Sequence, residues 1–240
     1  MEPHNHPSLI RRTLIDAMKT GQYANCRQLP SEHELSEKLN VSRTMLRDVL
    51  AALEREGLIL RRHGIGTIIN RHVLDLSCRM DIETEFLEMI EQSGFTPSVS
   101  FVRVSTRQAS EKTAQMLGIP ADSPVLHVER VCTADGKPAI YCDDILPTGI
   151  IKKKYTVEDL HAPIFSFLRQ FCGIESYMDV TTVRPVIADD TLAQLLQLSP
   201  GVPLLNMEEL NLDRSGTPIF LSRQYFVDGI IQHTVVRKKL

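Results

Sequence analysis

Two arginines in the first third of the chain, Arg43 and Arg47, are four residues apart, so on a helix both lie on one face. Ser42 directly precedes them and is a typical N-cap residue, which places them in the first turns of a helix predicted over residues 43–56. The amino end of a helix carries partial positive charge, and arginines there can reach phosphates or guanine edges. The pair therefore indicates nucleic-acid binding. Taken alone, such a pair is more commonly a solvated helix face.

A short hairpin is predicted directly after this helix. Residues 58–62 and 67–70 have the composition of two short strands, and the four residues between them are His63, Gly64, Ile65 and Gly66. A small, basic tip that contains glycine can approach a sugar-phosphate backbone closely. We call this hairpin the wing.

Three predicted helices position these residues, and each has a recognisable beginning or end. The first follows Ser8 as N-cap and ends at Gly21, with an apolar residue at every fourth position: Ile10, Leu14 and Met18. The second begins with the capping box of Ser31 and Glu34 and closes at Asn40. The third has one apolar stripe, made of Leu46, Val49, Leu50 and Leu53. A short helix, a tight turn and a helix with exposed arginines are typical of a helix-turn-helix.

The second part of the chain contains an internal repeat, because residues 109–126 match residues 188–205 at an offset of 79. Each copy predicts a capped helix, a proline-containing turn and the start of a strand, followed by a turn and a second strand. The duplication predicts an α+β domain in which both copies contribute to one antiparallel sheet with helices on it. A cleft between the two halves is a natural place for a small ligand.

The repeat matches three further pairs of positions: Arg130 with Glu209, Cys132 with Asn211, and Cys142 with Ser222. Arg130 and Cys132 alternate along one predicted strand and therefore share a face. If that face lines the cleft, Arg130 and Glu209 bring opposite charges to it, and Glu209 is the expected partner of Arg130 in the empty protein. The alternative is that both are outward charges at a sheet edge.

Residues 29–67 resemble the winged-helix DNA-binding domain of the GntR family of bacterial transcription regulators. The elements L-P-S-E, V-S-R-T, L-R, L-x-x-E-G-L and G-x-G-T fall at the family's spacing over about forty consecutive residues. The resemblance implies that the DNA-contacting residues are His33, Ser42, Arg43, Thr44, Arg47, His63, Gly64 and Gly66. Met45 and Asp48 depart from the family pattern, which affects the bases that are read more than DNA binding itself.

From about Gly94 to its carboxyl end the chain resembles the UTRA ligand-binding domain of the HutC subfamily of these regulators, which is similar in fold to chorismate lyase. Residues 128–138 match the subfamily pattern R-x-R-x-A-D-G-x-P, with Arg130 at the first arginine and Cys132 in place of the second. In the sugar-phosphate sensors of the subfamily both arginines hold the phosphate. The resemblance therefore implies a different effector, less anionic or more apolar, for example a carboxylate held by Arg130.

The composition fits a division of the chain into a DNA-binding part and a ligand-binding part. The 240 residues are 42% hydrophobic and 24% charged, as in ordinary globular proteins. The net charge of −3 is divided into +3 for residues 1–72 and −6 for residues 73–240, and a basic first part suits an anionic partner. We expect a DNA-binding domain over 1–72, a linker with a short helix capped by Asp81 over 73–94, and an effector-binding and dimerisation domain over 95–240. The segment 71–94 is expected to be the only covalent route between the two domains.

These observations predict a DNA-binding transcription regulator, a repressor that binds a palindromic operator as a homodimer and responds to a small molecule. The alternatives are a constitutive DNA-binding protein whose second domain only dimerises, and a lyase-like enzyme tethered to DNA. No G-x-S-x-G, no metal-ligand spacing of histidines and no C-x-x-C among five cysteines is present, so no catalysis, cofactor or metal is expected. No secretory signal or apolar run of membrane-spanning length is visible, and a cytoplasmic location is expected.

Overall fold

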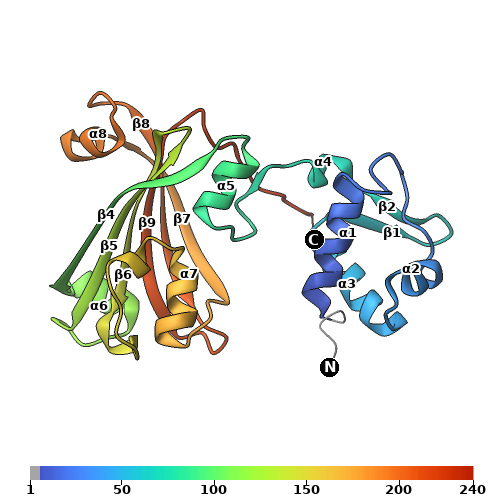
Figure 1. Cartoon of the computed structure of the whole chain (residues 1–240), viewed down its shortest axis with the longest axis horizontal. Helices are drawn as coiled ribbons and strands as arrows, with labels where there is room; N and C mark the ends of the chain where they lie inside the picture. Colours follow the sequence, from blue (N-terminus) through green and yellow to red (C-terminus); the bar gives the residue numbers. More distant parts are fainter. Residues whose placement is uncertain (1–5, 240) are drawn as a thin grey trace. The chain divides into compact units, whose positions relative to one another are not determined.

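The structure is a computed structural model that describes residues 6–239 (Figure 1). It contains two compact units: the first consists of the residues up to Asp81 together with those from Thr234 onward, and the second is Ile82–His233. The division at Asp81–Ile82 lies inside the segment expected to be a linker. Residues 234–239, expected in the effector-binding domain, belong to the first unit.

The first unit is a helix-turn-helix with a wing, and its elements are α1 (Pro7–Lys19), α2 (Glu32–Leu39), α3 (Arg43–Arg55), β1 (Ile59–Arg62) and β2 (Gly66–Ile69). Its core joins all three helices to the hairpin and includes Leu14, Met18, Leu35, Leu46, Leu50, Leu53 and Ile59. The predicted capping box forms, because Ser31 Oγ accepts from Glu34 N while the Glu34 carboxylate accepts from Ser31 N. Asn40 closes α2 in the left-handed conformation, with φ 52°.

The beginning of α1 differs from the prediction. The helix starts at Pro7 with His6 as the N-cap residue, and the Ser8 hydroxyl bonds the ring of His6 at 2.6 Å instead of capping the backbone. Proline at the first helical position explains the shift, since its fixed φ suits a helix start and its missing N–H needs no partner there.

The carboxyl-terminal segment returns to the first unit. After α4 (Arg71–Leu74), β3 (Cys78–Arg79) pairs with β10 (His233–Thr234), and Met80 N donates to Thr234 O at 2.8 Å. Farther along, Lys238 Nζ donates to the carbonyl oxygens of Glu54 and Arg55, at the end of α3. The chain thus passes between the units twice, and the expectation of one covalent route is wrong.

The second unit contains a six-stranded antiparallel sheet in the order β4-β5-β6-β9-β8-β7. Its strands are β4 (Pro97–Gln108), β5 (Pro124–Ala134), β6 (Lys137–Pro147), β7 (Met178–Ile187), β8 (Pro203–Leu212) and β9 (Pro218–Phe226). This confirms the predicted α+β class with one shared sheet. The repeated unit is one strand longer than predicted, because β4 precedes α6 (Glu111–Leu117) just as β7 precedes α8 (Asp190–Leu196).

Helices cover both faces of this sheet (Figure 1). On one face of the sheet, Val125, Ile145 and Leu221 pack with α6. Val131 and Leu204 pack with α8. The alternate residues of β5, β6 and β9, such as Val128, pack with the segments between the two repeats: η2 (Thr148–Ile150), η3 (Glu158–Leu160), α7 (Ile164–Phe167) and η4 (Leu168–Cys172).

The helix before the sheet, α5 (Phe86–Gln92), contacts β4 and β5. It begins after Glu85, so Asp81 does not cap it. The Asp81 carboxylate accepts instead from the Arg79 guanidinium and from Val236 N. Within residues 6–239, none of the helices combines the length and apolar character that crossing a bilayer requires.

Candidate functional site

The first candidate surface lies at the amino end of α3. Ser42 is the N-cap, and its hydroxyl accepts from Met45 N at 3.2 Å. Arg43 and Thr44 follow in the first turn, and both are exposed. Within the described part of the chain, no side-chain hydrogen bond or ion pair restrains Arg43. Its guanidinium is therefore available to an external acceptor next to the positive end of the helix dipole.

Acidic residues of α2 hold the other basic residues predicted at this surface. Arg47 Nε donates to Glu32 Oε2 at 2.7 Å, and Nε2 of His33 lies 3.6 Å from Oε1 of Glu37. All four side chains are at least partly exposed. The sequence interpretation did not include Glu32, although its place in the first turn of the preceding helix was visible. A nucleic acid that contacts Arg47 must compete with this carboxylate.

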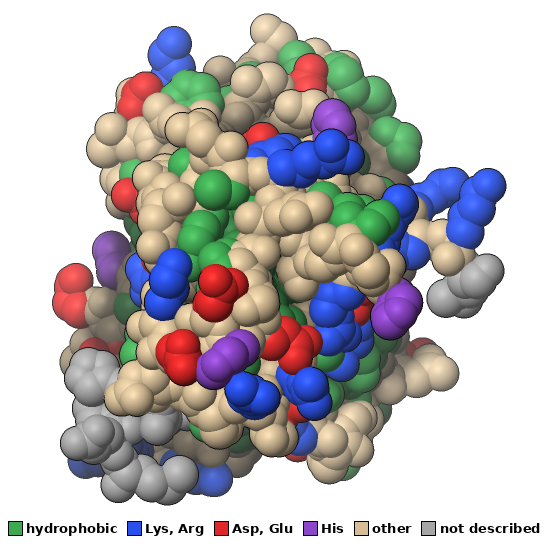
Figure 2. All heavy atoms as spheres, turned by 90° about the vertical axis from the view of Figure 1, so that its right-hand side faces the viewer, with side chains coloured by type: hydrophobic (Ala, Val, Ile, Leu, Met, Phe, Trp, Pro, Cys, Tyr) green, Lys and Arg blue, Asp and Glu red, His purple; other side chains and the backbone are tan. Residues whose placement is uncertain are grey.

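The wing presents the predicted tip. In the ladder Arg62 is opposite Gly66, and His63, Gly64, Ile65 and Gly66 are all exposed. Gly64 and Gly66 have φ angles of 76° and 107°, which residues that carry a Cβ rarely adopt. Figure 2, viewed from the right-hand side of Figure 1, shows Lys, Arg and His side chains interspersed with Asp and Glu. The face in this view therefore does not carry a uniform basic surface.

The second candidate site is a polar row on the sheet face below α5 and α7. Arg130, on β5, is buried, with Nη2 donating to Asp144 Oδ2 at 2.5 Å and Nη1 donating to Ala162 O at 2.9 Å. The expected pairing of Arg130 with Glu209 is therefore wrong. Asp144 lies two residues beyond Cys142 on β6 and so shares its face. That periodicity was the available signal for Asp144, which the sequence interpretation missed.

Hydrogen bonds extend this row across the sheet. Ser222 Oγ donates to Asp144 Oδ1 at 2.6 Å, and Gln224 Nε2 contacts both Ser222 Oγ and Glu209 Oε2, at 2.9 and 2.5 Å. Arg130 and Glu209 thus lie at opposite ends of one network. Asn211, on the same strand as Glu209, is buried and accepts from Ser176 Oγ at 3.1 Å.

A small cavity lies above the Arg130 end of the row. Its lining includes Glu85, Phe86, Val99, Arg130, Cys132 and His161, so α5 and the segment before α7 cover it. The free space accommodates about one water molecule. The cavity is over the first repeat only, whereas a cleft between the two halves was expected. Of the six predicted residues, Arg130 and Cys132 line it, and Cys142, Glu209, Asn211 and Ser222 do not.

Burial changes the ionisation of the carboxyl groups around the row. Desolvation raises the pKa of Glu85 to about 7, against the opposing charges of Arg130 and Arg169. Desolvation also raises the pKa of Glu209 to about 7, although Gln224 donates to its charged form. Arg130 Nε is buried and has no partner among the described residues. The site therefore contains both an unused donor and carboxyl groups that titrate near neutrality.

The raised pKa of Glu209 predicts a loss of stability as pH rises. The folded state holds the proton up to about pH 7, whereas the unfolded chain releases it near 4.5. The stabilising contribution is complete below pH 4.5 and is lost as pH rises through 7. We expect Glu209→Gln to be more stable than the wild type by about 1 kcal/mol at pH 8, and by less at pH 5. Urea unfolding followed by circular dichroism measures the difference.

Glu208 provides the matched control. It is the neighbouring residue on β8, and although burial opposes it, Arg223 and Lys112 lower its pKa. Glu208→Gln is therefore expected to reduce stability at pH 8. A Glu209→Gln variant that follows the same direction as Glu208→Gln would show that Glu209 is charged and stabilised in the folded protein.

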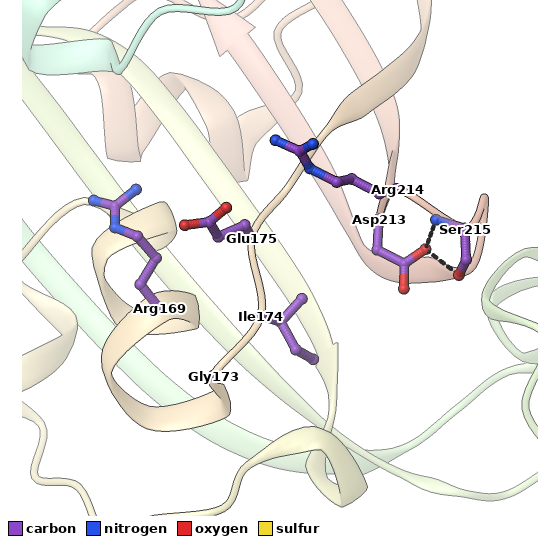
Figure 3. Close-up of a pocket in the computed structure, with 7 residues that line it drawn as sticks. All are labelled: Arg169, Gly173, Ile174, Glu175, Asp213, Arg214 and Ser215. Atoms are coloured by element: carbon purple, nitrogen blue, oxygen red, sulfur yellow. Dashed lines mark hydrogen bonds between the residues drawn. The ribbon is translucent and has the colours of Figure 1, made fainter. Parts of the chain in front are cut away.

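A larger, open hollow lies elsewhere on the second unit (Figure 3). It is lined by Arg169 of η4, by the residues that follow η4 and by the β8–β9 turn, and Figure 3 shows Glu175 between Arg169 and Arg214. Asp213 faces its own turn, where it accepts from the backbone N–H and the hydroxyl of Ser215. None of the predicted effector residues lines this hollow. Over residues 6–239, no group of three His, Cys, Asp or Glu side chains is arranged to hold a metal ion.

Two family profiles match the chain. The family profile described as the UTRA domain matches residues 92–228, more than half of the chain, and the profile described as bacterial regulatory proteins, gntR family, matches residues 8–69.

Individual relatives match along nearly the whole chain. An uncharacterized HTH-type transcriptional regulator of Rhizobium meliloti is 27% identical over 215 residues, covering 88% of this chain and 86% of that protein. A Shigella flexneri protein named "Probable fructoselysine utilization operon transcriptional repressor" is 24% identical over 231 residues, covering 96% and 93%. The crystal structure of a Bacillus subtilis protein described as possible transcriptional regulator YydK superposes with a TM-score of 0.77 at 19% identity, covering 96% and 99%. The last match shows a shared fold.

Proposed function

The chain belongs to the gntR family of bacterial regulatory proteins and carries a UTRA domain, and from this premise we propose that it is a repressor controlled by a small-molecule effector. It is a DNA-binding transcription regulator, and its relatives are regulators rather than enzymes. The repressor assignment is supported by the name of the Shigella flexneri relative, and effector control by the presence of the UTRA domain together with the cavity.

The observation that supports the DNA interface is the unrestrained Arg43 at the amino end of α3, in the same unit as an exposed wing. We propose that the operator is contacted by His33, Ser42, Arg43, Thr44, Arg47, His63, Gly64 and Gly66. One winged head offers little surface, so we propose that two copies of the chain bind a palindromic operator.

We propose that the effector binds at the cavity beside Arg130. With room for about one water molecule, the cavity must open to take a larger molecule, and α5 is the helix that covers it. α5 begins four residues after the chain enters the second unit at Ile82. Displacement of α5 by the effector would therefore act directly on a segment connected to the first unit.

The nature of the effector follows from the charges in place. Cys132 stands where sugar-phosphate sensors have a second arginine, and Asp144 already neutralises Arg130. A phosphate ester would meet one compensated guanidinium and the Glu85 carboxyl group. We therefore propose an effector that is not a sugar phosphate. A carboxylate effector would compete with Asp144 for Arg130, not with Glu209 as the sequence suggested.

Coupling between effector and operator is the test of this function. Metabolites that raise the melting temperature are identified first, and their affinities are then measured with and without operator. We expect the effector to weaken operator binding and the operator to weaken effector binding by the same factor, since the two are linked equilibria. Equal effector affinity in the presence and absence of operator would contradict effector control.

A constitutive DNA-binding protein with a dimerising second domain is the second candidate. The small volume of the cavity favours it, because a site with room for about one water molecule does not bind a metabolite without rearrangement. This function predicts that no metabolite shifts the melting temperature.

A further inference from the structure

Two thiols lie together next to the buried Arg130 side chain. Cys142 is directly opposite Arg130 in the β5–β6 ladder, and Cys132 follows Arg130 by two residues, so all three share one face. Cys142 Sγ donates to the carbonyl oxygen of Arg130 at 3.7 Å. Both cysteines are almost completely buried, with 3% of the surface of Cys132 and 0% of that of Cys142 exposed. Buried cysteines are ordinarily small apolar packing residues, and only their surroundings indicate another role.

The cavity distinguishes Cys132 from the other buried thiols. Cys132 is part of its lining, and the free space there is about the size of a water molecule. Hydrogen peroxide is only slightly larger than water, so it fits this space better than any bulky reagent does. Cys172 provides a contrast, because it is packed among apolar residues of the cluster that contains Phe167 and does not line the cavity.

The electrostatic environment favours the reactive form of Cys132. The thiolate is the nucleophile in thiol chemistry, and nearby cations and hydrogen bonds stabilise it. The neighbouring Cys142 thiol and the positive charge of Arg130 lower the pKa of Cys132, against the effects of burial and of the Asp144 carboxylate. Burial raises the pKa of Cys172. Within the second unit, therefore, Cys132 and Cys172 differ in the direction in which their surroundings shift the thiol pKa.

We propose that Cys132 and Cys142 are a hydroperoxide-reactive thiol pair, with Cys132 as the residue attacked through the cavity. This inference goes beyond the proposed effector function and does not depend on it. The Cys132 thiolate attacks the terminal oxygen of the hydroperoxide, the O–O bond breaks, and the products are Cys132 sulfenic acid and an alkoxide or hydroxide that takes up a proton. The Cys142 thiol then attacks the sulfenic sulfur and releases water. Overall, two thiols and one hydroperoxide give one disulfide, one alcohol or water, and one water.

The disulfide changes the wall of the cavity. Cys132 and Cys142 are diagonal rather than direct neighbours in the ladder, and diagonal positions are normally farther apart than a disulfide allows. The ladder is irregular between Cys132 and Thr133, so the backbone can adjust there more easily than in a regular strand. Oxidation therefore pulls this irregularity toward β6, next to the buried pair of Arg130 and Asp144.

Mass spectrometry of the full chain tests the proposal. The protein carries Cys26→Ser, because Cys26 is exposed and would consume the oxidant. After treatment with hydrogen peroxide, trypsin leaves residues 131–152 as one fragment, since Lys137 precedes a proline. We expect the mass of this fragment to fall by two hydrogens, the change that a disulfide produces. This change should be at least ten times faster than the oxidation of Cys172. In Cys142→Ser, dimedone should label Cys132, and in Cys132→Ser the Cys142 thiol should remain reduced.

The size of the oxidant provides the second arm. Cumene hydroperoxide is too large for the cavity and is expected to react at least ten times more slowly than hydrogen peroxide. Two results would overturn the proposal: oxidation of residues 131–152 no faster than that of Cys172, or equal rates with both hydroperoxides. The first would show that the thiols are inert packing residues, and the second that they react only after the site opens. The comparison with Cys172 and the comparison of the two hydroperoxides both use the Cys26→Ser chain with Cys132 and Cys142 intact.

Discussion

Replacing Arg130 by methionine lowers the free energy of unfolding of the second unit by an expected 3–5 kcal/mol or so, as for other broken buried ion pairs. The guanidinium of Arg130 and the carboxylate of Asp144 are 2.5 Å apart, and their side chains are 5% and 1% exposed. Without Arg130, Asp144 keeps only the hydrogen bond from Ser222, and its negative charge is left without compensation. Urea unfolding followed by circular dichroism measures the loss.

The double variant Arg130→Met/Asp144→Asn separates this cause from a general packing defect. Removing both charges should restore at least half of the lost stability, because no unpaired ion remains. The core of the first unit consists of its own residues, so both variants should still bind the operator. A double variant as unstable as the single one would show that Arg130 contributes by packing and by its bond to Ala162, not by neutralising Asp144.

Replacing Arg43 by alanine is expected to weaken operator binding by about 1–3 kcal/mol, and to relax the preference for one base. Arg43 is exposed at the first position of α3 and has no side-chain partner among the described residues, so its interaction with DNA does not replace an internal bond. Titrations on the operator and on random-sequence DNA at one fixed salt concentration measure both effects.

Arg55→Ala is the matched control, because Arg55 is an exposed arginine at the opposite end of the same helix. Its replacement should change operator affinity by less than about threefold. If Arg43→Ala reduces binding equally on operator and random DNA, Arg43 contacts a phosphate rather than a base. Operator binding that does not weaken with added salt would exclude the proposed DNA contacts altogether.

The features predicted from the sequence are those determined by residues close to one another in the chain. The capping box of Ser31 and Glu34, the cap at Ser42 and the apolar stripe of α3 each involve spacings of a single turn or two, and the structure contains all three. The internal repeat was also informative, because two copies of a helix and two strands can bury their apolar faces on one sheet. The predicted caps at Ser8 and Asp81 failed where Pro7 and Arg79 offered competing local interactions.

The composition of the polar row could not be predicted in this way. Equivalent residues of a repeat are related by the symmetry of the sheet, so they are close only when they lie next to the centre, between β6 and β9. Arg130 and Glu209 lie on β5 and β8, one strand farther out on each side, and therefore cannot meet. The partner of Arg130 depends on the register between β5 and β6, and the cavity depends on where α5 lies on the sheet. Neither is encoded in local spacing.

The return of the carboxyl-terminal segment to the first unit has a consequence for the order of synthesis. A ribosome makes α3 early, but Lys238, which binds the carbonyl groups at the end of α3, is made only after the whole second unit. A lysine at this end of a helix stabilises it through the helix dipole. A nascent or prematurely terminated chain therefore presents the helix of the DNA-binding unit without this stabilising contact. Completion of the first unit is in this way coupled to translation of the second.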